Sequence, residues 1–385
     1  METGKFDFDS PVDRRGTSAV KWDKYGDRDI IPMWVADMDF RCAPPILTAL
    51  RKRVEHGIFG YSNPPAGLID ATLAHLEKEY DWKIEPEWIV WLPGLVVGLN
   101  AVCRAFGRAG ADVVTAVPVY PPFLSAPVNG ARNAVRVPMT ESNGTWRWDL
   151  SALHEAITPS ARLLLLCNPH NPVGRVFSRD ELLAIAEVCA QHDLILCADE
   201  IHSGLILDRD KRHVPAASLS AQIAERTVTL MSASKTFNLP ALGCAYAVAS
   251  NPDLRVKLRR AMAGIVHHVG LMGYIGTEAA YRDGKPWQLA LLEYLRANRD
   301  MVEREIAKMP GLRIWHAEAT YLSWIDARAL PVENKIEFFN DKGIGLYDGA
   351  LFGTPGFLRL NFACTRALLE KALERMARAV HTLQK

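Results

Sequence analysis

The sequence lacks the features that mark several classes of protein. Its 45 basic side chains nearly cancel its 44 acidic ones, and a formal charge of +1 offers no basic surface to nucleic acid. The seven cysteines include no Cys-x-x-Cys pair, which disfavours a disulfide framework or a thiolate metal site and favours a reducing compartment. No apolar run approaches the about 18 residues of a membrane span, and Met1–Phe8 is charged where a signal peptide is apolar. We therefore expect a soluble, cytoplasmic protein with no nucleic-acid or membrane partner.

Two common enzyme motifs are also missing. No Gly-x-Gly-x-x-Gly follows the early predicted strands, which disfavours a nicotinamide-dependent dehydrogenase. No His-Glu-x-x-His or cluster of cysteine and histidine is present, which disfavours a zinc enzyme. The composition is otherwise that of a globular chain, and 385 residues predict two domains, because single cores rarely grow past about 250 to 300 residues.

Short apolar runs alternate with helix-length amphipathic segments from about residue 88 to residue 250. Most of these runs are apolar at consecutive positions, as strands buried on both faces are, which predicts an α/β fold with a mainly parallel sheet between helices. The expected strands are Trp88–Leu92, Asp112–Val117, Ala161–Cys167, Leu194–Ala198, Thr227–Met231 and Cys244–Ala249. We assign this large domain to residues 45–285.

The pattern changes after a helical stretch around Lys257–Arg296. A smaller sheet is expected, with strands at Leu312–Trp315, Tyr321–Ile325 and Phe357–Phe362 and a closing helix at Arg366–Leu383. Residues 286–385 are therefore predicted to form a small α+β domain. Residues 1–44 have proline, glycine and charge without periodicity, and we expect them to pack with this small domain.

Polar clusters follow three of the predicted strands of the large domain. They are Asn168–Gly174 (NPHNPVG), Asp199–His202 (DEIH) and Ser232–Lys235 (SASK). In open α/β sheets, ligands bind beyond the carboxyl ends of the strands. We therefore expect the three clusters to open into one crevice.

The crevice offers the groups that a cofactor with a pyridine ring, a phosphate and an aldehyde requires. Asp199 can keep a pyridine nitrogen protonated, Asn171 can donate to a phenolate, and Lys235 can form an imine. A helical pattern begins after Gly94, so backbone N–H groups of Gly94, Leu95 and Val96 can bind a phosphate, and Ser232 can add a hydroxyl. The sequence therefore predicts a site for pyridoxal 5'-phosphate.

Each of these residues has a plainer interpretation when it is taken alone. Asp199 could cap a helix, Asn171 could shape a turn between prolines, and Ser-x-Ser-Lys could be a solvated helix start. A buried histidine such as His202 is more often a satisfied core residue than a ligand. The occurrence of the three clusters at three strand ends is what favours the cofactor site.

On these motifs the chain resembles the aminotransferase-like (fold type I) pyridoxal-phosphate enzymes, and within them the MalY/PatB-type carbon–sulfur lyases, usually called cystathionine β-lyases. The segments that carry the resemblance include Pro32–Phe40 (PMWVADMDF), Phe59–Tyr61 (FGY), Asn168–Gly174, Ala198–Ser203 (ADEIHS), Ser234–Leu239 (SKTFNL) and Arg359–Asn361 (RLN). Trp34–Asp39 and Glu200–His202 point to the lyase branch. The resemblance implies a large-domain sheet of the seven-stranded type.

The resemblance also implies roles for individual residues. Lys235 is similar to the Schiff-base lysine, Asp199 to the partner of the pyridine nitrogen, and Asn171 to the phenolate donor, which also meets the substrate. Tyr120 is similar to the aromatic residue that stacks on the ring. Arg359 is similar to the arginine that binds the substrate α-carboxylate.

Other positions bear on the oligomeric state and on the distinction between lyases and aminotransferases. Tyr61 is similar to a tyrosine that reaches the phosphate of the neighbouring subunit's cofactor, which implies a homodimer with shared sites. His202 and Gly243 stand where aspartate aminotransferases have a tyrosine and a phosphate-binding arginine, and both differences favour the lyases. Many lyases of the branch have aspartate in place of Gly204 and proline in place of Gly98, so the substrate stays open.

The implied reaction is β-elimination from an L-amino acid with a sulfur leaving group, which gives a thiol, pyruvate and ammonia. L-Cystathionine is the first candidate, but other cysteine S-conjugates, S-alkyl sulfoxides or a thiohistidine precursor would use the same steps. Transamination of an L-amino acid would use the same residues. A regulatory protein built on this fold is a third alternative, because fold does not guarantee activity.

Overall fold

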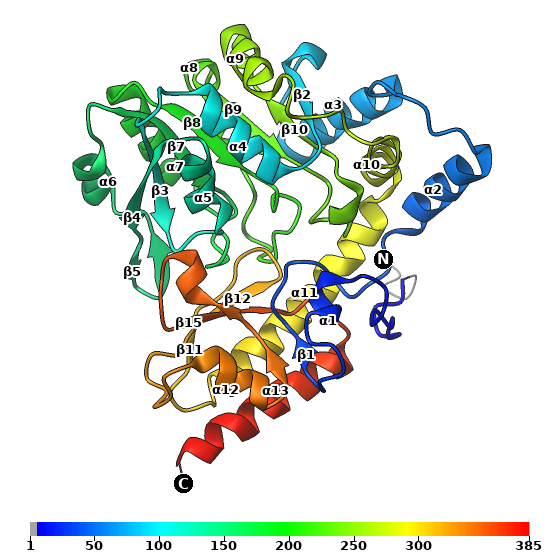
Figure 1. The fold of residues 1–385 in the computed structure, drawn as a ribbon, viewed down its shortest axis with the longest axis vertical. Helices are drawn as coiled ribbons and strands as arrows, with labels where there is room; N and C mark the ends of the chain where they lie inside the picture. The colour runs from blue at the N-terminus through cyan, green and yellow to red at the C-terminus, as the bar shows by residue number, and fades with distance from the viewer. Residues whose placement is uncertain (1–5, 385) are drawn as a thin grey trace.

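A seven-stranded sheet forms the centre of the larger part of the molecule (Figure 1). The computed structural model describes residues 6–384. The sheet has the order β2-β10-β9-β8-β7-β3-β4, and its strands are β2 (Ile89–Leu92), β3 (Asp112–Val117), β4 (Asn133–Pro138), β7 (Ala161–Cys167), β8 (Ile195–Asp199), β9 (Thr227–Met231) and β10 (Ala245–Val248). Neighbouring strands are parallel except at β10, which is antiparallel to both β2 and β9. The predicted α/β fold is confirmed.

The six strands predicted for this sheet agree with the observed bounds to within one residue. The edge strand β4 is not among them, because Val137 is its only buried residue, it contains the exposed polar residues Asn133 and Arg136, and it ends at Pro138. An edge strand needs only one partner and tolerates such residues. Its apolar signal is therefore too weak to mark it in the sequence.

Alternate side chains of the central strands pack on opposite faces of the sheet. On β7, Leu163 and Leu165 join one core cluster and Leu164 and Leu166 join another. The first cluster packs under helices α4 (Leu95–Ala105), α5 (Pro122–Asn129) and α9 (Pro252–Met262), and the second under α6 (Leu150–Ala156) and α7 (Arg179–Gln191). Burial on both faces explains the consecutive apolar positions of these strands.

The smaller part is built on a four-stranded antiparallel sheet in the order β11-β12-β15-β14. Its strands are β11 (Arg313–Ile314), β12 (Leu322–Asp326), β14 (Tyr347–Asp348) and β15 (Phe357–Asn361), and its helices are α12 (Lys335–Asp341) and α13 (Arg366–His381). The apolar side of α13 is buried at Leu369, Leu373, Met376 and Val380. The strand β14 was not predicted, because two residues give no periodicity.

The predicted helical stretch Lys257–Arg296 is three helices rather than one. After α9, the chain is irregular from Ala263 to Gly270, and α10 (Leu271–Asp283) and α11 (Lys285–Ile306) are then separated by Gly284. The long helix α11 runs from the larger part into the smaller part (Figure 1). The remaining elements are α1 (Val20–Asp23), α2 (Pro44–His56), α3 (Ala66–Tyr80), α8 (Ala221–Glu225), β5 (Thr140–Ser142) and β6 (Thr145–Arg147).

The N-terminal segment is attached to the smaller part. Its strand β1 (Ile31–Pro32) pairs in parallel with β13 (Ile344–Gly345). Lys21 is fully buried, and its Nζ lies 2.7 Å from Asp39, whose other oxygen lies 2.7 Å from Arg14. Burial opposes ionisation of Asp39, but the charge of Lys21 and the surrounding hydrogen bonds hold its pKa below the ordinary value.

Among the described residues, no helix is long and apolar enough to cross a membrane. The same residues include no group of three or more histidine, cysteine, aspartate or glutamate side chains that could bind a metal ion. All seven cysteines are free thiols. The first five residues of the charged start, Met1–Phe8, lie outside the described residues.

We predict that Lys21→Met lowers the free energy of unfolding by about 3 kcal/mol, because it removes the fully buried one of the two cations that lie 2.7 Å from the buried Asp39 carboxylate. The urea midpoint of unfolding measures the change. The matched control is Arg28→Met, which breaks an exposed pair with Asp341 at 3.6 Å and should cost at most about 1 kcal/mol. Equal urea midpoints for the two variants would show that Lys21 stabilises the fold no more than an exposed ion pair does.

The stability that the ionised Asp39 contributes should be fully present above the ordinary carboxyl pKa. It should be lost as the pH falls through the lower pKa that Asp39 has in the folded protein.

Candidate active site

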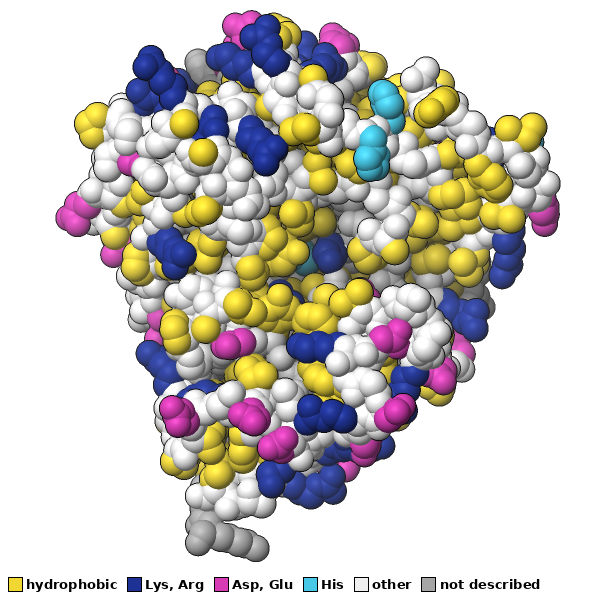
Figure 2. Space-filling model, in the orientation of Figure 1, with side chains coloured by type: hydrophobic (Ala, Val, Ile, Leu, Met, Phe, Trp, Pro, Cys, Tyr) yellow, Lys and Arg dark blue, Asp and Glu magenta, His cyan; other side chains and the backbone are white. Residues whose placement is uncertain are grey.

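The carboxyl ends of β7, β8 and β9 open onto a cavity of about 300 Å³ between the two parts of the molecule. This face is hollowed near its centre, as Figure 2 shows. Ten of the residues predicted for the site line the cavity, namely Gly94, Leu95, Val96, Tyr120, Asn171, Asp199, His202, Ser232, Lys235 and Arg359. The structure therefore brings together side chains that are up to 265 positions apart (359 − 94) in the chain.

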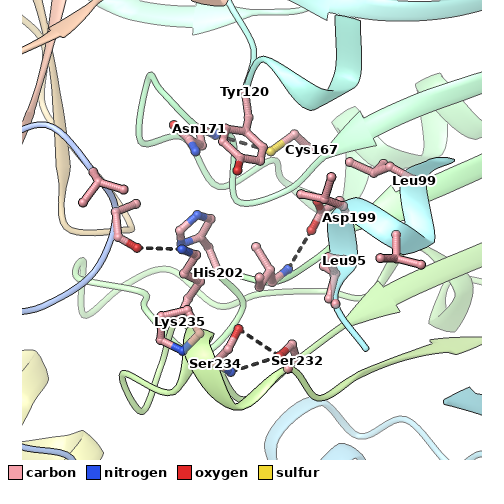
Figure 3. Close-up of a pocket in the computed structure, with 18 of the residues that line it drawn as sticks. Leu95, Leu99, Tyr120, Cys167, Asn171, Asp199, His202, Ser232, Ser234 and Lys235 are labelled. Carbon is pink, nitrogen blue, oxygen red and sulfur yellow. Dashed lines mark hydrogen bonds between the residues drawn. The ribbon is translucent and has the colours of Figure 1, made fainter. Parts of the chain in front are cut away.

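Asp199 is the last residue of β8 and is buried beside the cavity (Figure 3). Its Oδ1 accepts a hydrogen bond from the backbone N–H of Ile201 at 3.1 Å. Burial raises the pKa of this carboxyl to about 7, against the lowering effect of the Ile201 N–H. A carboxylate in this position is stabilised by a cation, and a protonated pyridine nitrogen would provide one.

Lys235 follows β9, and its Nζ donates a hydrogen bond to the backbone carbonyl of Ala36 at 2.6 Å. Burial and, after it, the charge of Arg359 lower the pKa of the amine to about 8, against the raising effect of Asp37 and Asp199. Part of the amine is therefore neutral near pH 7 to 8. A neutral amine is the form that adds to an aldehyde.

Arg359 is fully buried and holds Asn171 in place. Its Nη1 donates to Asn171 Oδ1 at 3.0 Å, and its Nη2 donates to the Trp34 carbonyl at 2.8 Å. The guanidinium carbon lies 4.8 Å from the ring centres of Tyr347 and Phe352. Because Asn171 Oδ1 is an acceptor, the NH₂ group of this side chain is the one left to donate.

The other end of the cavity has the features of a phosphate site. Gly94 has extended backbone and precedes α4, and a Cβ atom built on it meets no atom within 4 Å. The N–H groups of the first helical turn attract an anion. Beside them, the hydroxyls of Ser232 and Ser234 lie 2.9 Å apart.

His202 is buried next to Lys235 (Figure 3). Its Nδ1 has no hydrogen-bond partner within the described part of the chain. Burial, together with the charges of Lys235 and Arg359, lowers the pKa of the imidazole to about 3. The ring is therefore neutral, with one N–H to donate.

Among the cavity residues that the sequence prediction did not assign to the site are Ser234, Val35, Ala36 and Tyr347. Ser234 lies inside the SASK cluster, and Val35 and Ala36 lie inside the PMWVADMDF segment, so a sequence signal was present for these three. Tyr347 belongs to the two-residue strand β14 and has no such signal. Its contact with Arg359 appears only in the folded chain.

One predicted site residue lies outside the cavity of its own chain. Tyr61 is fully exposed and lines a second, open groove together with Phe59, His267 and His268. The groove lies between the segment after α2 and the segment before α10. The structure of a single chain therefore does not bring Tyr61 to Lys235.

Gly204 and Gly98, which differ from many lyases of the branch, and Gly243, which differs from the aspartate aminotransferases, have different surroundings. A Cβ atom on Gly204 would lie 2.5 Å from Thr236 Oγ1, so an aspartate there requires Thr236 to move. Gly98 is part of α4, and a Cβ atom on it would lie 3.0 Å from Leu92 and 3.2 Å from Leu230. Gly243 lines the cavity in the left-handed conformation, with φ of 60°.

Comparison with known proteins agrees with this architecture. Residues 28–376 match the family model described as aminotransferase class I and II. The cystathionine β-lyase PatB of Bacillus subtilis (strain 168) is 37% identical, over 97% of this chain and 99% of PatB. The crystal structure of OvoB has a TM-score of 0.95 and 45% identity, covering 97% of this chain and 99% of OvoB.

A third relative has a crystal structure that contains pyridoxal 5'-phosphate. It is cystalysin from Treponema denticola, with a TM-score of 0.94 and 30% identity over 98% of this chain and 99% of that chain. The fold is that of the fold type I, aminotransferase-like pyridoxal-phosphate enzymes. The chain belongs to the aminotransferase class I and II family, in the branch that contains the PatB and MalY proteins.

We predict that Gly94→Val weakens the binding of pyridoxal 5'-phosphate by about tenfold or more, because its side chain would enter the space at the start of α4. Spectroscopic titration of cofactor-depleted protein measures the dissociation constant. The thermal midpoint of the depleted protein should not change, since the backbone is extended and the added Cβ contacts no atom. Undiminished affinity in this variant would place the phosphate elsewhere.

Proposed function

We propose that the protein is a pyridoxal 5'-phosphate-dependent carbon–sulfur β-lyase. It cleaves the Cβ–S bond of L-cystathionine or a related cysteine S-conjugate to a thiol, pyruvate and ammonia. The observation that carries the proposal is the convergence of Lys235, Asp199 and Arg359 on one buried cavity, in a chain whose relatives include cystathionine β-lyases.

Pyridoxal 5'-phosphate, when bound, supplies an aldehyde that takes up amines and a ring that withdraws electrons from the bonds to Cα. Asp199 would hold the ring nitrogen protonated, and Asn171 and the neutral His202 would donate to the phenolic oxygen. Tyr120 would cover one face of the ring. Gly94, Leu95, Val96 and Ser232 would bind the phosphate through backbone N–H groups and a hydroxyl.

The substrate would be bound mainly by Arg359. Its guanidinium can hold the α-carboxylate through two parallel N–H donors, and Tyr347 and Phe352 fix its plane. With its amine free and neutral, Lys235 would remove the α-proton as a general base. The sulfur then leaves Cβ with its bonding electron pair and is protonated to the thiol. Water converts the remaining three-carbon fragment to pyruvate and ammonia.

The defining experiment measures pyruvate, ammonia and free thiol released from L-cystathionine by purified, cofactor-saturated protein. We expect the three products in equal amounts. If no products are released from L-cystathionine, the substrate is another sulfur conjugate, such as an S-alkyl sulfoxide or a thiohistidine precursor. Conversion of a keto-acid acceptor to its amino acid would instead indicate transamination. A protein that binds the cofactor but turns over none of these would support the regulatory alternative.

We predict that Lys235→Ala lowers the rate of pyruvate release by a factor of about 10⁴, because the variant has no amine to act as base. The control is Lys308→Ala, which removes a surface lysine paired with Glu305 and should retain full activity. Turnover at the parent rate in Lys235→Ala would remove this lysine from the mechanism.

We further propose a homodimer in which each chain completes the other's active site. Tyr61 is fully exposed, and its neighbours Ile58 and Phe59 are exposed apolar residues, which an interface would cover. In the groove that Tyr61 shares with His267, the occupant would be a second copy of the chain, related by a twofold axis. Tyr61 would then reach the phosphate in the neighbouring cavity.

The shared site predicts complementation between two defective chains. Lys235→Ala and Tyr61→Ala chains, co-expressed with different tags, should form a hybrid dimer with one intact site, namely the site whose Lys235 and partner Tyr61 are both native. The purified hybrid should have about half the activity of the parent dimer. A hybrid no more active than the Tyr61→Ala dimer would show that Tyr61 acts within its own chain.

We propose the cytoplasm as the location, which the seven free thiols support. The division into residues 1–44, 45–285 and 286–385 is also a proposal. The pairing of β1 with β13 supports grouping the N-terminal segment with the small domain, and the start of α11 at Lys285 supports the second boundary. Limited proteolysis would test both boundaries.

A further inference from the structure

A row of backbone carbonyls in the N-terminal segment accepts hydrogen bonds from side chains of the active site and of β15. The Trp34 carbonyl accepts a hydrogen bond from Arg359 at 2.8 Å. The side-chain amide of Asn361 donates to the carbonyls of Val35 at 2.6 Å and Asp37 at 2.7 Å. This stretch of backbone is therefore held in place by side chains from β15.

The Ala36 carbonyl, in the middle of this row, has two donors. Lys235 Nζ lies 2.6 Å from its oxygen and the Tyr321 hydroxyl lies 3.0 Å from it. A carbonyl oxygen has two lone pairs, so the lysine and the tyrosine together use its acceptor capacity. Tyr321 is fully buried and is not among the residues that line the cavity.

The chain holds Tyr321 in this position at a cost in backbone strain. Thr320, the residue before it, has φ of 72°, a conformation that a β-branched residue rarely adopts. Thr320 is fixed by its N–H, which donates to the Leu205 carbonyl at 2.8 Å, and by its hydroxyl, which accepts from Leu322 N at 3.1 Å. The contact between Tyr321 and Ala36 is therefore determined by the surrounding structure.

We propose that Tyr321 is a positioning residue that acts on Lys235 through the Ala36 carbonyl. When a substrate amine has displaced Lys235, an N–H of the freed amine donates to this oxygen. That bond sets the direction of the amine's lone pair, which takes the α-proton while the electron pair of the C–H bond stays with the substrate. The inference rests on the proposed role of Lys235 as the base.

Loss of the Tyr321 hydroxyl has two expected effects. The carbonyl is less firmly fixed, so the lone pair of Lys235 is less well aimed, and misplacement of a catalytic group slows proton transfer. The oxygen also keeps more of its electron density for the lysine, which stabilises the ammonium form and raises the pKa of Lys235. The rising limb of the pH profile, which requires the neutral amine, should therefore move to higher pH.

The other groups that face Lys235 are the same in the parent and the variant. Arg359 and the neutral His202 lie beside it in the cavity, and the carboxylates of Asp199 and Asp37 act on it from β8 and from the N-terminal segment. Tyr321 keeps its proton throughout the working range, because burial raises the pKa of its hydroxyl, and the charge of Asp37 raises it further. A change in the pH profile of Tyr321→Phe can thus be assigned to the missing hydroxyl.

The test is exchange of the α-hydrogen of L-alanine in D₂O by the holoenzyme, followed by NMR between pH 6 and 10. L-Alanine has no leaving group on Cβ, so exchange reports proton transfer alone. For Tyr321→Phe we expect kcat to fall about tenfold with KM within about twofold, because Tyr321 does not line the cavity. The rising limb should move up by about half a pH unit or more.

A second readout does not depend on turnover. Only the neutral amine of Lys235 adds to the aldehyde of pyridoxal 5'-phosphate, so the rate of cofactor uptake by depleted full-length protein, followed by absorbance, should show the same upward shift in pH dependence. The matched control is Tyr281→Phe, which removes a hydroxyl that lies 3.0 Å from the Tyr246 hydroxyl, away from Ala36. It should leave both profiles unchanged.

The outcomes separate the inference from the proposed function. Unshifted profiles and parent kcat in Tyr321→Phe, with Lys235→Ala inactive, would overturn the positioning role alone. Exchange at the parent rate in Lys235→Ala would remove the base assignment and the inference with it. If Tyr321→Phe loses thermal stability and activity but keeps the parent pH profiles, its role is structural and the inference is wrong.

Discussion

The confinement of three ionisable groups in one buried cavity is the constraint on which the rest of the site depends. Lys235 and Arg359 are both cations, and each makes the charged form of the other less favourable, while burial does the same to Asp199. The protein supports this arrangement with hydrogen bonds to Asn171, Trp34 and Ala36. A neutral amine close to physiological pH is the result, and it is the property that imine chemistry requires.

The N-terminal segment is part of the site rather than an appendage to it. The buried pair of Lys21 and Asp39 joins two parts of the segment, and the segment is attached to the small domain by the ladder between β1 and β13 and by Asn361, which donates to its carbonyls. A wall made of backbone carbonyls offers acceptors whose positions do not depend on side-chain rotamers. The positions of these acceptors are therefore set by packing far from the reacting atoms.

The sequence was sufficient to predict those strands and site residues that a local pattern of side chains marks. Runs such as Ala161–Cys167 are apolar at every core position, and Asp199 and Lys235 lie at strand ends, so the sheet and the main site residues could be predicted. The edge strand β4 and the short β14 could not, because pairing rather than composition defines them. Neither could the contact of Tyr321 with Ala36, since it joins residues 285 positions apart and depends on one strained turn at Thr320.

The pairing of the first strand with a segment near the end of the chain bears on how the protein is made. Synthesis proceeds from the N-terminus, so Ile31–Pro32 has no strand partner until Ile344–Gly345 has left the ribosome. The carbonyls of Trp34 and Val35 likewise lack their hydrogen-bond donors until Arg359 and Asn361 have been synthesised. The nascent chain therefore passes through a stage in which the large sheet is complete and Lys235 is present but its wall is missing. The complete cofactor site therefore forms only after the chain up to Asn361 has left the ribosome.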